Sequence, residues 1–320
     1  PTAKNFATVH TNIPMFSFNP LKLFQYSKLI RSLNPDLVHF TLSPQYAPLL
    51  RRPYVTFTHD LTMFKFVRAG KLPLPLHWAR MFAYRYLMWR VHKKAVWVHT
   101  PTQYVADAVN KKYLFTNRKT SVTLEASEPP LPVKATVPEE DPGEFILYTG
   151  SAFPHKNLER LILAFGILRE SHPDLKLVLV GKKEWHKKKL EQWATKSGNA
   201  EGVIFTVFIP DEELKWYYEN AKAYIFPSMS DGFGVPALEA QVHSCPVVSS
   251  DATCLPEVAG DGAHYFDPYD VADMAHKIND VITDTRLRNK LIAAGYENVK
   301  RFSWSKMAKE TLSIYDKILK

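Results

Sequence analysis

Short apolar runs alternate along the chain with segments whose apolar residues recur at helical spacing. The apolar runs predict buried strands at 36–40, 54–58, 95–99, 145–149, 175–180, 202–205, 223–226 and 246–249. Short buried strands that alternate with amphipathic helices are typical of parallel sheets with helices on both faces. A last helix is predicted at 303–318, where Ser303 can cap the first turn. The pattern therefore predicts an α/β fold.

A proline-rich segment divides this pattern into two halves. Residues 126–144 contain five prolines, which favour neither a helix nor a strand. We predict a Rossmann-like domain at 1–133, a linker at 134–143, a second Rossmann-like domain at 144–302 and a final helix at 303–320. Sheets of this kind bind ligands at the carboxyl ends of their strands, so the two domains are expected to face a cleft.

The N-terminal half contains few strands and almost no glycine. We count three strands in it, and residues 1–142 contain one glycine, Gly70. A Rossmann-like domain usually opens with a strand and a glycine-bearing loop. We therefore expect this domain to lack its first strand and loop, unless Asn5–Met15 supplies the strand.

The composition is that of an ordinary globular protein, with 46% hydrophobic and 23% charged residues among 320. No apolar run approaches the roughly 18 residues of a membrane span. The two cysteines, Cys245 and Cys254, favour a reducing compartment over a disulfide framework, so we expect a cytoplasmic protein. Their spacing is wrong for a zinc site.

The net charge of +9 is distributed unevenly. Residues 1–135 hold 19 basic and 5 acidic residues, a net charge of +14. Residues 136–320 hold 22 basic and 27 acidic residues, a net charge of −5. The basic half is expected to attract an anionic partner such as anionic lipid, a phosphorylated acceptor or nucleic acid. Nucleic acid is the least favoured of these, because the chain contains no recognised binding motif.

A basic helical segment at 76–96 is the strongest membrane candidate in this half. Aromatic residues are interleaved there with five basic ones, Arg80, Arg85, Arg90, Lys93 and Lys94. A basic helix with aromatic anchors can lie on an anionic bilayer, which makes these five candidate membrane or acceptor contacts. In the alternative interpretation, the aromatic side chains belong to the core and the charges form a solvated face.

The segment after the apolar run 223–226 has the most informative spacing in the chain. It places Asp231 before a Gly232-Phe233-Gly234 turn and Glu239 eight residues after Asp231. A strand that leads through such a turn into a helix leaves unpaired backbone N–H groups at the helix start, which favour anions. We expect Asp231 to bind sugar hydroxyls, Glu239 to bind ribose, and the backbone from Gly232 to Val235 to face phosphate. The alternative is an ordinary helix start that favours an acidic residue.

Two further segments follow predicted strands. After 145–149 come Gly150 and Ser151 in a tight turn and then Lys156, which can neutralise a diphosphate leaving group. Lys156 can equally be an exposed lysine at a helix start. After 54–58 comes His59, which is expected to face the cleft or to be structural.

These motifs together resemble the retaining glycosyltransferases of family 4, or glycosyl transferases group 1. The resemblance is strongest over 144–318 and rests on the Gly150 to Asn157 turn, Phe226-Pro-Ser, Asp231…Glu239, Pro246-Val-Val, Leu255-Pro-Glu-Val-Ala-Gly260 and Phe302-Ser-Trp304. The first half matches more weakly, through Pro35-Asp-Leu-Val-His39, His59-Asp-Leu61 and 100–109.

The resemblance implies a GT-B fold, with nucleotide-sugar in the second domain and acceptor in the first, and with a final helix that crosses back. It implies hexose transfer with retention and without a metal or cofactor, and it makes His59 and Asp231 the candidate catalytic residues. The absence of any Asp-x-Asp motif agrees with metal independence. GDP-mannose is the family-level donor, and UDP-sugars remain open. Family members often act at the cytoplasmic membrane face on lipid-linked or polymeric acceptors.

The chain departs from the family pattern at several positions. The first signature carboxylate is Asp231 where Glu is usual, Ser151 stands where Arg is frequent, and His243-Ser-Cys245 replaces Ala-Cys-Gly. Two alternatives therefore stay open. One is a nucleotide-sugar epimerase or hydrolase of the same architecture, and the other is an inactive nucleotide-sugar-binding module.

Overall fold

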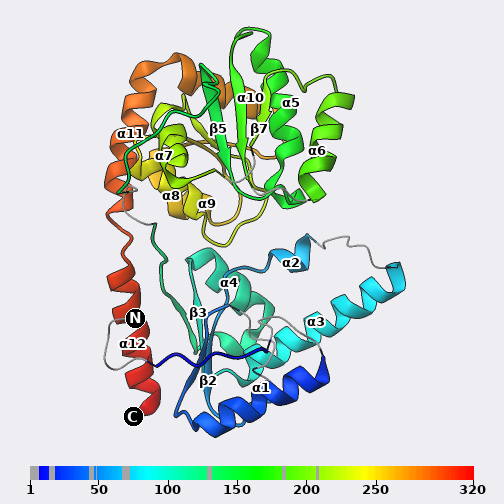
Figure 1. Cartoon of the computed structure of the whole chain (residues 1–320). Coiled ribbons are helices and arrows are strands. Elements are labelled where there is room, and N and C mark those ends of the chain that lie inside the picture. The colour runs from blue at the N-terminus through cyan, green and yellow to red at the C-terminus, as the bar shows by residue number, and fades with distance from the viewer. Residues whose placement is uncertain are drawn as a thin grey trace.

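The computed structural model describes residues 7–13, 19–42, 47, 49–66, 73–127, 132–181, 185–206 and 209–320. Within them the chain forms two parallel sheets, each with its own helices (Figure 1). The α/β prediction is confirmed, and the break between the sheets falls in the proline-rich segment. No helix among the described residues is both long and apolar enough to cross a membrane.

The first sheet has four parallel strands in the order β1-β2-β3-β4. They are β1 (Val38–Phe40), β2 (Tyr54–Phe57), β3 (Trp97–Thr100) and β4 (Thr120–Val122). The helical elements around it are α1 (Pro20–Leu33), α2 (Thr62–Lys65), α3 (Leu74–Lys94), α4 (Gln103–Lys112) and the 3-10 turn η2 (Leu114–Thr116). A core that includes Val38, Val91, Val98 and Val109 joins these helices to the strands.

The second sheet has six parallel strands in the order β10-β9-β8-β5-β6-β7. They are β5 (Phe145–Thr149), β6 (Lys176–Val180), β7 (Val203–Phe205), β8 (Tyr224–Phe226), β9 (Val247–Ser250) and β10 (Ala263–Phe266). Its helices are α5 (Leu158–Arg169), α6 (Trp185–Lys196), α7 (Asp211–Asn220), α8 (Val235–Val242), α9 (Leu255–Ala259), α10 (Val271–Thr283) and α11 (Thr285–Val299), with 3-10 turns η3 (Pro154–Lys156) and η4 (Gly260–Gly262).

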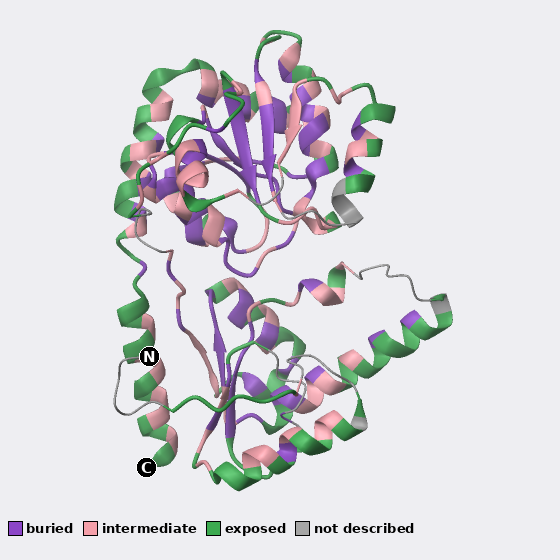
Figure 2. Cartoon of the chain, in the orientation of Figure 1, coloured by how far each residue is buried: buried purple, intermediate pink, exposed green. Residues whose placement is uncertain are grey.

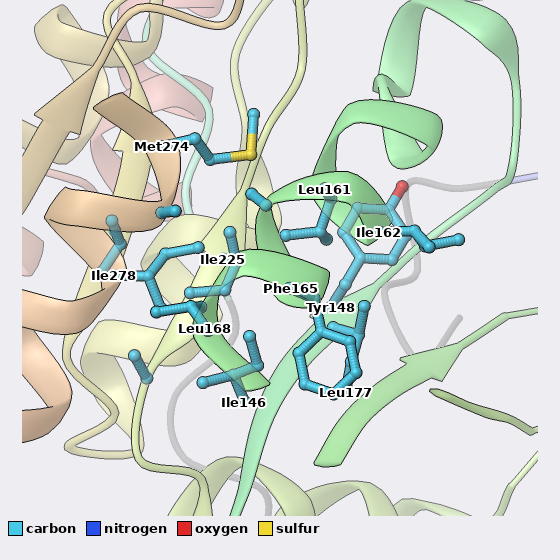
Figure 3. Packing of buried hydrophobic residues seen from close by; sticks show 14 of the residues in the cluster. Ile146, Tyr148, Leu161, Ile162, Phe165, Leu168, Leu177, Ile225, Met274 and Ile278 are labelled. Carbon is cyan, nitrogen blue, oxygen red and sulfur yellow. The ribbon is translucent and has the colours of Figure 1, made fainter. Parts of the chain in front are cut away.

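Apolar side chains cover both faces of the second sheet. On one face Leu161 and Phe165 of α5 pack with Ile146 of β5 and Ile278 of α10 (Figure 3). A second cluster, which includes Phe226 and Leu255, packs on the other face. The central strands are buried, β7 is half-buried, and many exposed residues lie along the outer helices (Figure 2). Burial on both faces explains why these strands are continuous apolar runs in the sequence.

The sequence prediction missed two strands, β4 and β10. The count of three strands in the first half is therefore wrong, because β4 pairs with β3. Both missed strands lie at the edge of their sheet, and Thr120-Ser121-Val122 and Ala263-His264-Tyr265-Phe266 mix polar with apolar residues. An edge strand needs less apolar surface, so its sequence signal is weaker. In the segment Asn5–Met15, residues 7–13 form no strand and the others lie outside the described residues.

The chain passes between the two sheets twice. The first passage includes Leu124 and Ala126, and the second includes Phe302, directly before α12 (Trp304–Leu319). Ser303 caps α12 by accepting a hydrogen bond from the Lys306 amide at 3.4 Å, as predicted. The helix lies against the first sheet, where the Tyr315 hydroxyl hydrogen-bonds with His39 Nδ1 and the Lys317 ammonium lies 4.6 Å from the centre of the Trp97 ring (Figure 1).

Candidate active site

The turn between β8 and α8 carries the predicted pair of carboxylates. Gly234 has a φ of 101°, a left-handed conformation that other residues adopt at a cost, and it opens α8 without a side-chain cap. A Cβ on Gly234 would lie 2.8 Å from Leu255 Cδ2, so the turn also lacks room for a side chain. The glycine spacing therefore fixes the entry into α8, with Val235 as its first residue.

Lys156 and Asp231 form an ion pair. Lys156 ends η3 after β5, Asp231 follows β8, and Nζ lies 2.6 Å from Oδ2, with side-chain exposures of 17% and 19%. β5 and β8 are neighbouring parallel strands, with Leu147 opposite Tyr224, so the loops at their carboxyl ends meet. The Met229 amide also donates to the His155 carbonyl at 2.8 Å, which ties the two loops together.

Glu239 lies one turn into α8 and is anchored by Tyr218 of α7. The Tyr218 hydroxyl donates to Glu239 Oε2 at 3.0 Å and lies 2.9 Å from Thr149 Oγ1 at the end of β5. Burial raises the pKa of Glu239, and the hydrogen bond from Tyr218 partly opposes this by stabilising the carboxylate. The carboxylate is thus held toward the same end of β5 as Lys156.

Three other residues predicted to bind the nucleotide-sugar, Gly150, Ser151 and Phe233, differ in burial and in their contacts. Gly150 is exposed, and its amide donates to the Val180 carbonyl at 2.9 Å, while the Ser151 carbonyl accepts from the Tyr148 hydroxyl at 2.8 Å. Phe233 is 4% exposed and its ring packs edge-on against Phe302, with centroids 5.6 Å apart. Its side chain therefore belongs to a hydrophobic cluster, and a contact with a ligand would have to involve its backbone.

A small hollow lies at the carboxyl ends of β5, β6 and β7. Gly150 lines it, and the other lining residues include Leu158, Gly181, Leu190, Phe205 and Thr206. The hollow is mainly apolar, and Gly150 connects it to the loop that carries Lys156.

His59 lies in the first domain, two residues beyond the end of β2. Its Nδ1 is 2.8 Å from Glu125 Oε1 and its Nε2 is 2.7 Å from the Thr41 carbonyl, so both ring nitrogens face acceptors. Burial alone lowers the pKa of His59, but the hydrogen bonds to Glu125 and Thr41 and the charges of Glu125 and Asp60 outweigh it and raise the pKa. The surroundings therefore favour the imidazolium form.

The turn at 231–234, called the donor turn below after its predicted role, touches the first domain directly. A Cβ on Gly232 would lie 1.9 Å from the His59 carbonyl oxygen, which shows how closely the two backbones approach. Thr102 Oγ1 donates to the Gly232 carbonyl at 3.0 Å, and Thr62 Oγ1 lies 2.9 Å from Ser230 Oγ. The structure therefore brings the His59 backbone beside this turn, while the imidazole ring binds Glu125 and the Thr41 carbonyl of its own domain.

Four of the five basic candidates on α3 are exposed to solvent. Arg80, Arg85, Lys93 and Lys94 are exposed and Arg90 is half-buried. Between them lie exposed aromatic side chains, Trp78 at 61%, Phe82 at 75% and Tyr86 at 57%. Residues 78, 82 and 86 are spaced by four, so they form one stripe along the helix. The idea that all the aromatic residues here belong to the core is therefore wrong for these three.

Several residues at the site escaped sequence reasoning. Glu125 lies in the crossing segment next to the proline-rich linker, Tyr218 belongs to a helix without a motif, and Thr102 was visible only as part of the segment 100–109. Glu257 was visible only as part of the Leu255-Pro-Glu motif. Its carboxylate accepts hydrogen bonds from two α4 amides of the other domain. None of these contacts has a local signal, because each joins residues more than 20 positions apart.

Comparison with known proteins assigns the family. The family described as Glycosyl transferases group 1 matches residues 133–298, and the one described as Glycosyltransferase Family 4 matches 5–123. The chain belongs to the glycosyl transferases group 1. It is 35% identical over 173 residues to O-antigen chain mannosyltransferase B of Escherichia coli, covering 53% of this chain and 45% of that protein. It is 26% identical over 280 residues to O-antigen chain mannosyltransferase RfbU of Salmonella typhimurium, covering 85% and 73%.

The match to the first of these relatives spans less than half of that relative's length. Solved structures agree on the fold. Sucrose-phosphate synthase of Thermosynechococcus elongatus superposes with a TM-score of 0.75 at 17% identity, covering 93% of this chain and 77% of that one. Anabaena HepE, solved with UDP and glucose, superposes with a TM-score of 0.71 at 19% identity, covering 92% of this chain and 81% of that one. The GT-B fold is thereby confirmed.

Proposed function

We propose that this protein transfers a hexose from a nucleoside-diphosphate sugar to a glycan or lipid-linked acceptor, with retention at the anomeric carbon and without a metal or cofactor. One observation carries the proposal. Lys156, Asp231 and Glu239 converge at the carboxyl ends of β5 and β8, beside the uncapped first turn of α8 and opposite His59. A cation, an anion-favouring helix start and two sugar-binding carboxylates form a complementary set for a nucleotide-sugar.

Each group has a distinct task in this proposal. The Lys156 ammonium and the α8 amides stabilise the charge that develops on the departing diphosphate. Asp231 accepts hydrogen bonds from hydroxyls of the transferred sugar, and Glu239, whose position Tyr218 sets, accepts those of the ribose. The His59 backbone contacts the turn that carries Asp231, and its imidazolium form, favoured by the raised pKa, places a positive charge on the acceptor side.

The nucleobase is proposed to lie at the hollow formed by the carboxyl ends of β5, β6 and β7. Its lining is mainly apolar, which suits the faces of a planar base. Gly150 lines the hollow and begins the loop that carries Lys156, and in this proposal the diphosphate extends from the base along that loop toward the ammonium.

GDP-mannose is the proposed donor. The relatives named above are mannosyltransferases by name, and UDP-sugars form the alternative. A thermal-shift panel of GDP- and UDP-sugars, each with and without a divalent metal, tests this. A ligand at 100 times its dissociation constant stabilises by about 2.7 kcal/mol. A metal-independent shift with one base supports the proposal, and no shift with any donor would favour an inactive module.

Two variants test the chemistry. Lys156→Ala and Glu239→Gln should each lower transfer to an acceptor by a factor of 100 or more, since a single well-placed charge in such a site typically contributes about that much. Lys222→Ala is the matched control, because Lys222 forms a similar ion pair with Glu144 at 2.6 Å, directly before β5 at the other end of the sheet. Near-normal transfer in both variants would reject the proposal. Donor cleavage or epimerisation without an acceptor product would point to the epimerase or hydrolase alternative.

The exposed stripe on α3 is proposed to rest on the anionic cytoplasmic face of a membrane. The stripe adds aromatic anchors to a half of the chain with a net charge of +14. Binding to vesicles with anionic lipid should exceed binding to neutral vesicles, and the double change Trp78→Ala and Phe82→Ala should weaken it. Ile167→Ala, an exposed apolar change in the second domain, should leave it unchanged. Equal binding by all variants would reject this surface.

A further inference from the structure

Glu257 reaches from the second domain to the N-terminus of α4 in the first. Its Oε1 accepts a hydrogen bond from the Gln103 amide at 2.7 Å, and its Oε2 accepts one from the Tyr104 amide at 2.9 Å. These are the first two amides of α4, and such amides have no partner within their own helix. A carboxylate at this position also interacts favourably with the helix dipole. One domain therefore caps a helix of the other.

The same end of α4 touches the donor turn. Thr102 caps α4 by accepting from the Val105 amide at 3.2 Å, and its hydroxyl donates to the Gly232 carbonyl at 3.0 Å. The Tyr104 side chain packs against the hydrophobic cores of both domains. Residues 102–104 thus form a continuous contact with the second domain, and Glu257 supplies its charged component.

Glu257 is itself connected to the donor turn. Cys254, directly before α9, donates from Sγ to the Phe233 carbonyl at 3.4 Å, and Arg301 Nη2 donates to the Glu257 carbonyl at 3.2 Å. Phe233 packs in one cluster with Ala126 and Phe302, which belong to the two passages between the domains. The cap on α4, the donor turn and both interdomain passages are therefore one connected group.

We propose that Glu257 is an interdomain clasp whose hold on α4 sets the closed position of the two domains and so keeps the Asp231 turn against His59. It acts as a positioning residue for the transfer reaction, and its part in that reaction rests on the proposed function. Releasing the carboxylate leaves two helix amides without their partner and allows Gly232 to separate from the His59 carbonyl.

The clasp is tested with Glu257→Ala, with the near-isosteric Glu257→Gln and with Glu159→Ala as control. Glu159 is an exposed carboxylate in the first turn of α5, within the second domain. Amide hydrogen exchange at Gln103 and Tyr104 should speed up at least tenfold in Glu257→Ala, less in Glu257→Gln, and not in the control, because a hydrogen bond to a charged group typically contributes tenfold or more. Small-angle X-ray scattering should show a larger radius of gyration in Glu257→Ala.

Kinetics separate positioning from simple support of the fold. In Glu257→Ala, kcat for transfer from GDP-mannose should fall at least tenfold while exchange in the α10 core stays at the wild-type rate. Glu257→Gln, which keeps one acceptor, should recover part of the kcat. Unchanged exchange at Gln103 and Tyr104, or faster exchange with wild-type radius of gyration and kcat, would overturn the clasp. If even the wild-type protein transfers no sugar, but exchange and scattering change as stated, the proposed function fails and the clasp stands.

Discussion

Replacing Gly232 by alanine tests the close backbone contact between the two domains. The added Cβ would lie 1.9 Å from the His59 carbonyl oxygen and 2.8 Å from its carbon, whereas ordinary contacts are at least 3.4 Å. Both partners are backbone, so neither can rotate away, and the turn and the His59 strand end must separate by about 1.5 Å. The φ of Gly232 is outside the left-handed region, so the effect is steric.

A displacement of about 1 Å in an active site can cost roughly 100-fold in rate. We therefore expect kcat/KM of Gly232→Ala to fall by about that factor, measured as nucleoside diphosphate released from GDP-mannose in the presence of acceptor. Gly143→Ala is the control, since its Cβ would meet no atom within 4 Å. It carries the backbone cost of a φ of 74° but lies before β5, whereas Gly232 follows β8 at the opposite end of the sheet. A kcat/KM of Gly232→Ala within threefold of wild type would refute the reasoning.

Three further predictions concern groups around the site. Because the pKa of His59 is raised in the folded state, its contribution to stability is full below the unfolded pKa of about 6.5 and is lost as pH rises through the higher folded pKa. The free energy of unfolding should therefore fall with rising pH more steeply in wild type than in Glu125→Gln, and identical urea midpoint profiles between about pH 6 and 8 would contradict this. Tyr218→Phe removes the hydrogen bond that the hydroxyl donates to Glu239 and should raise the already elevated pKa of that carboxyl further. As pH is lowered, the GDP affinity measured by calorimetry should therefore begin to drop at a higher pH than in wild type, and an unshifted profile would count against the role of Glu239. Phe233→Ala should lower the free energy of unfolding by about 3–5 kcal/mol in denaturant titrations, whereas Phe82→Ala, at an exposed position, should lower it by about 1 kcal/mol or less. Equal losses would show that the cluster with Phe302 contributes little.

The central strands and the donor turn were predictable because their signals are local. A strand buried on both faces must be continuously apolar, and a turn into α8 that has a φ of 101° and no room for a Cβ favours glycine. The same locality explains the correct placement of Ser303 as the cap of α12. The edge strands β4 and β10 were missed because partial exposure leaves them with mixed polarity.

The partners of the predicted residues were beyond the reach of the sequence. Lys156 and Asp231 lie 75 positions apart, and they meet because the strand order places β5 beside β8. Glu125, the partner of His59, directly precedes the proline-rich segment and belongs to no motif. Glu257 caps a helix 154 positions away, in the other domain.

The sequence by itself determined the alternation of strands and helices, the break between two domains and the local shape of the Asp231 turn, because periodicity, proline and glycine act over a few residues. The tertiary structure decided which charges meet, which side chains of α3 face solvent and how Gly232 approaches His59. Such contacts depend on the order of parallel strands and on the closure of two domains. Neither property can be recognised from the local sequence around the residues that come into contact.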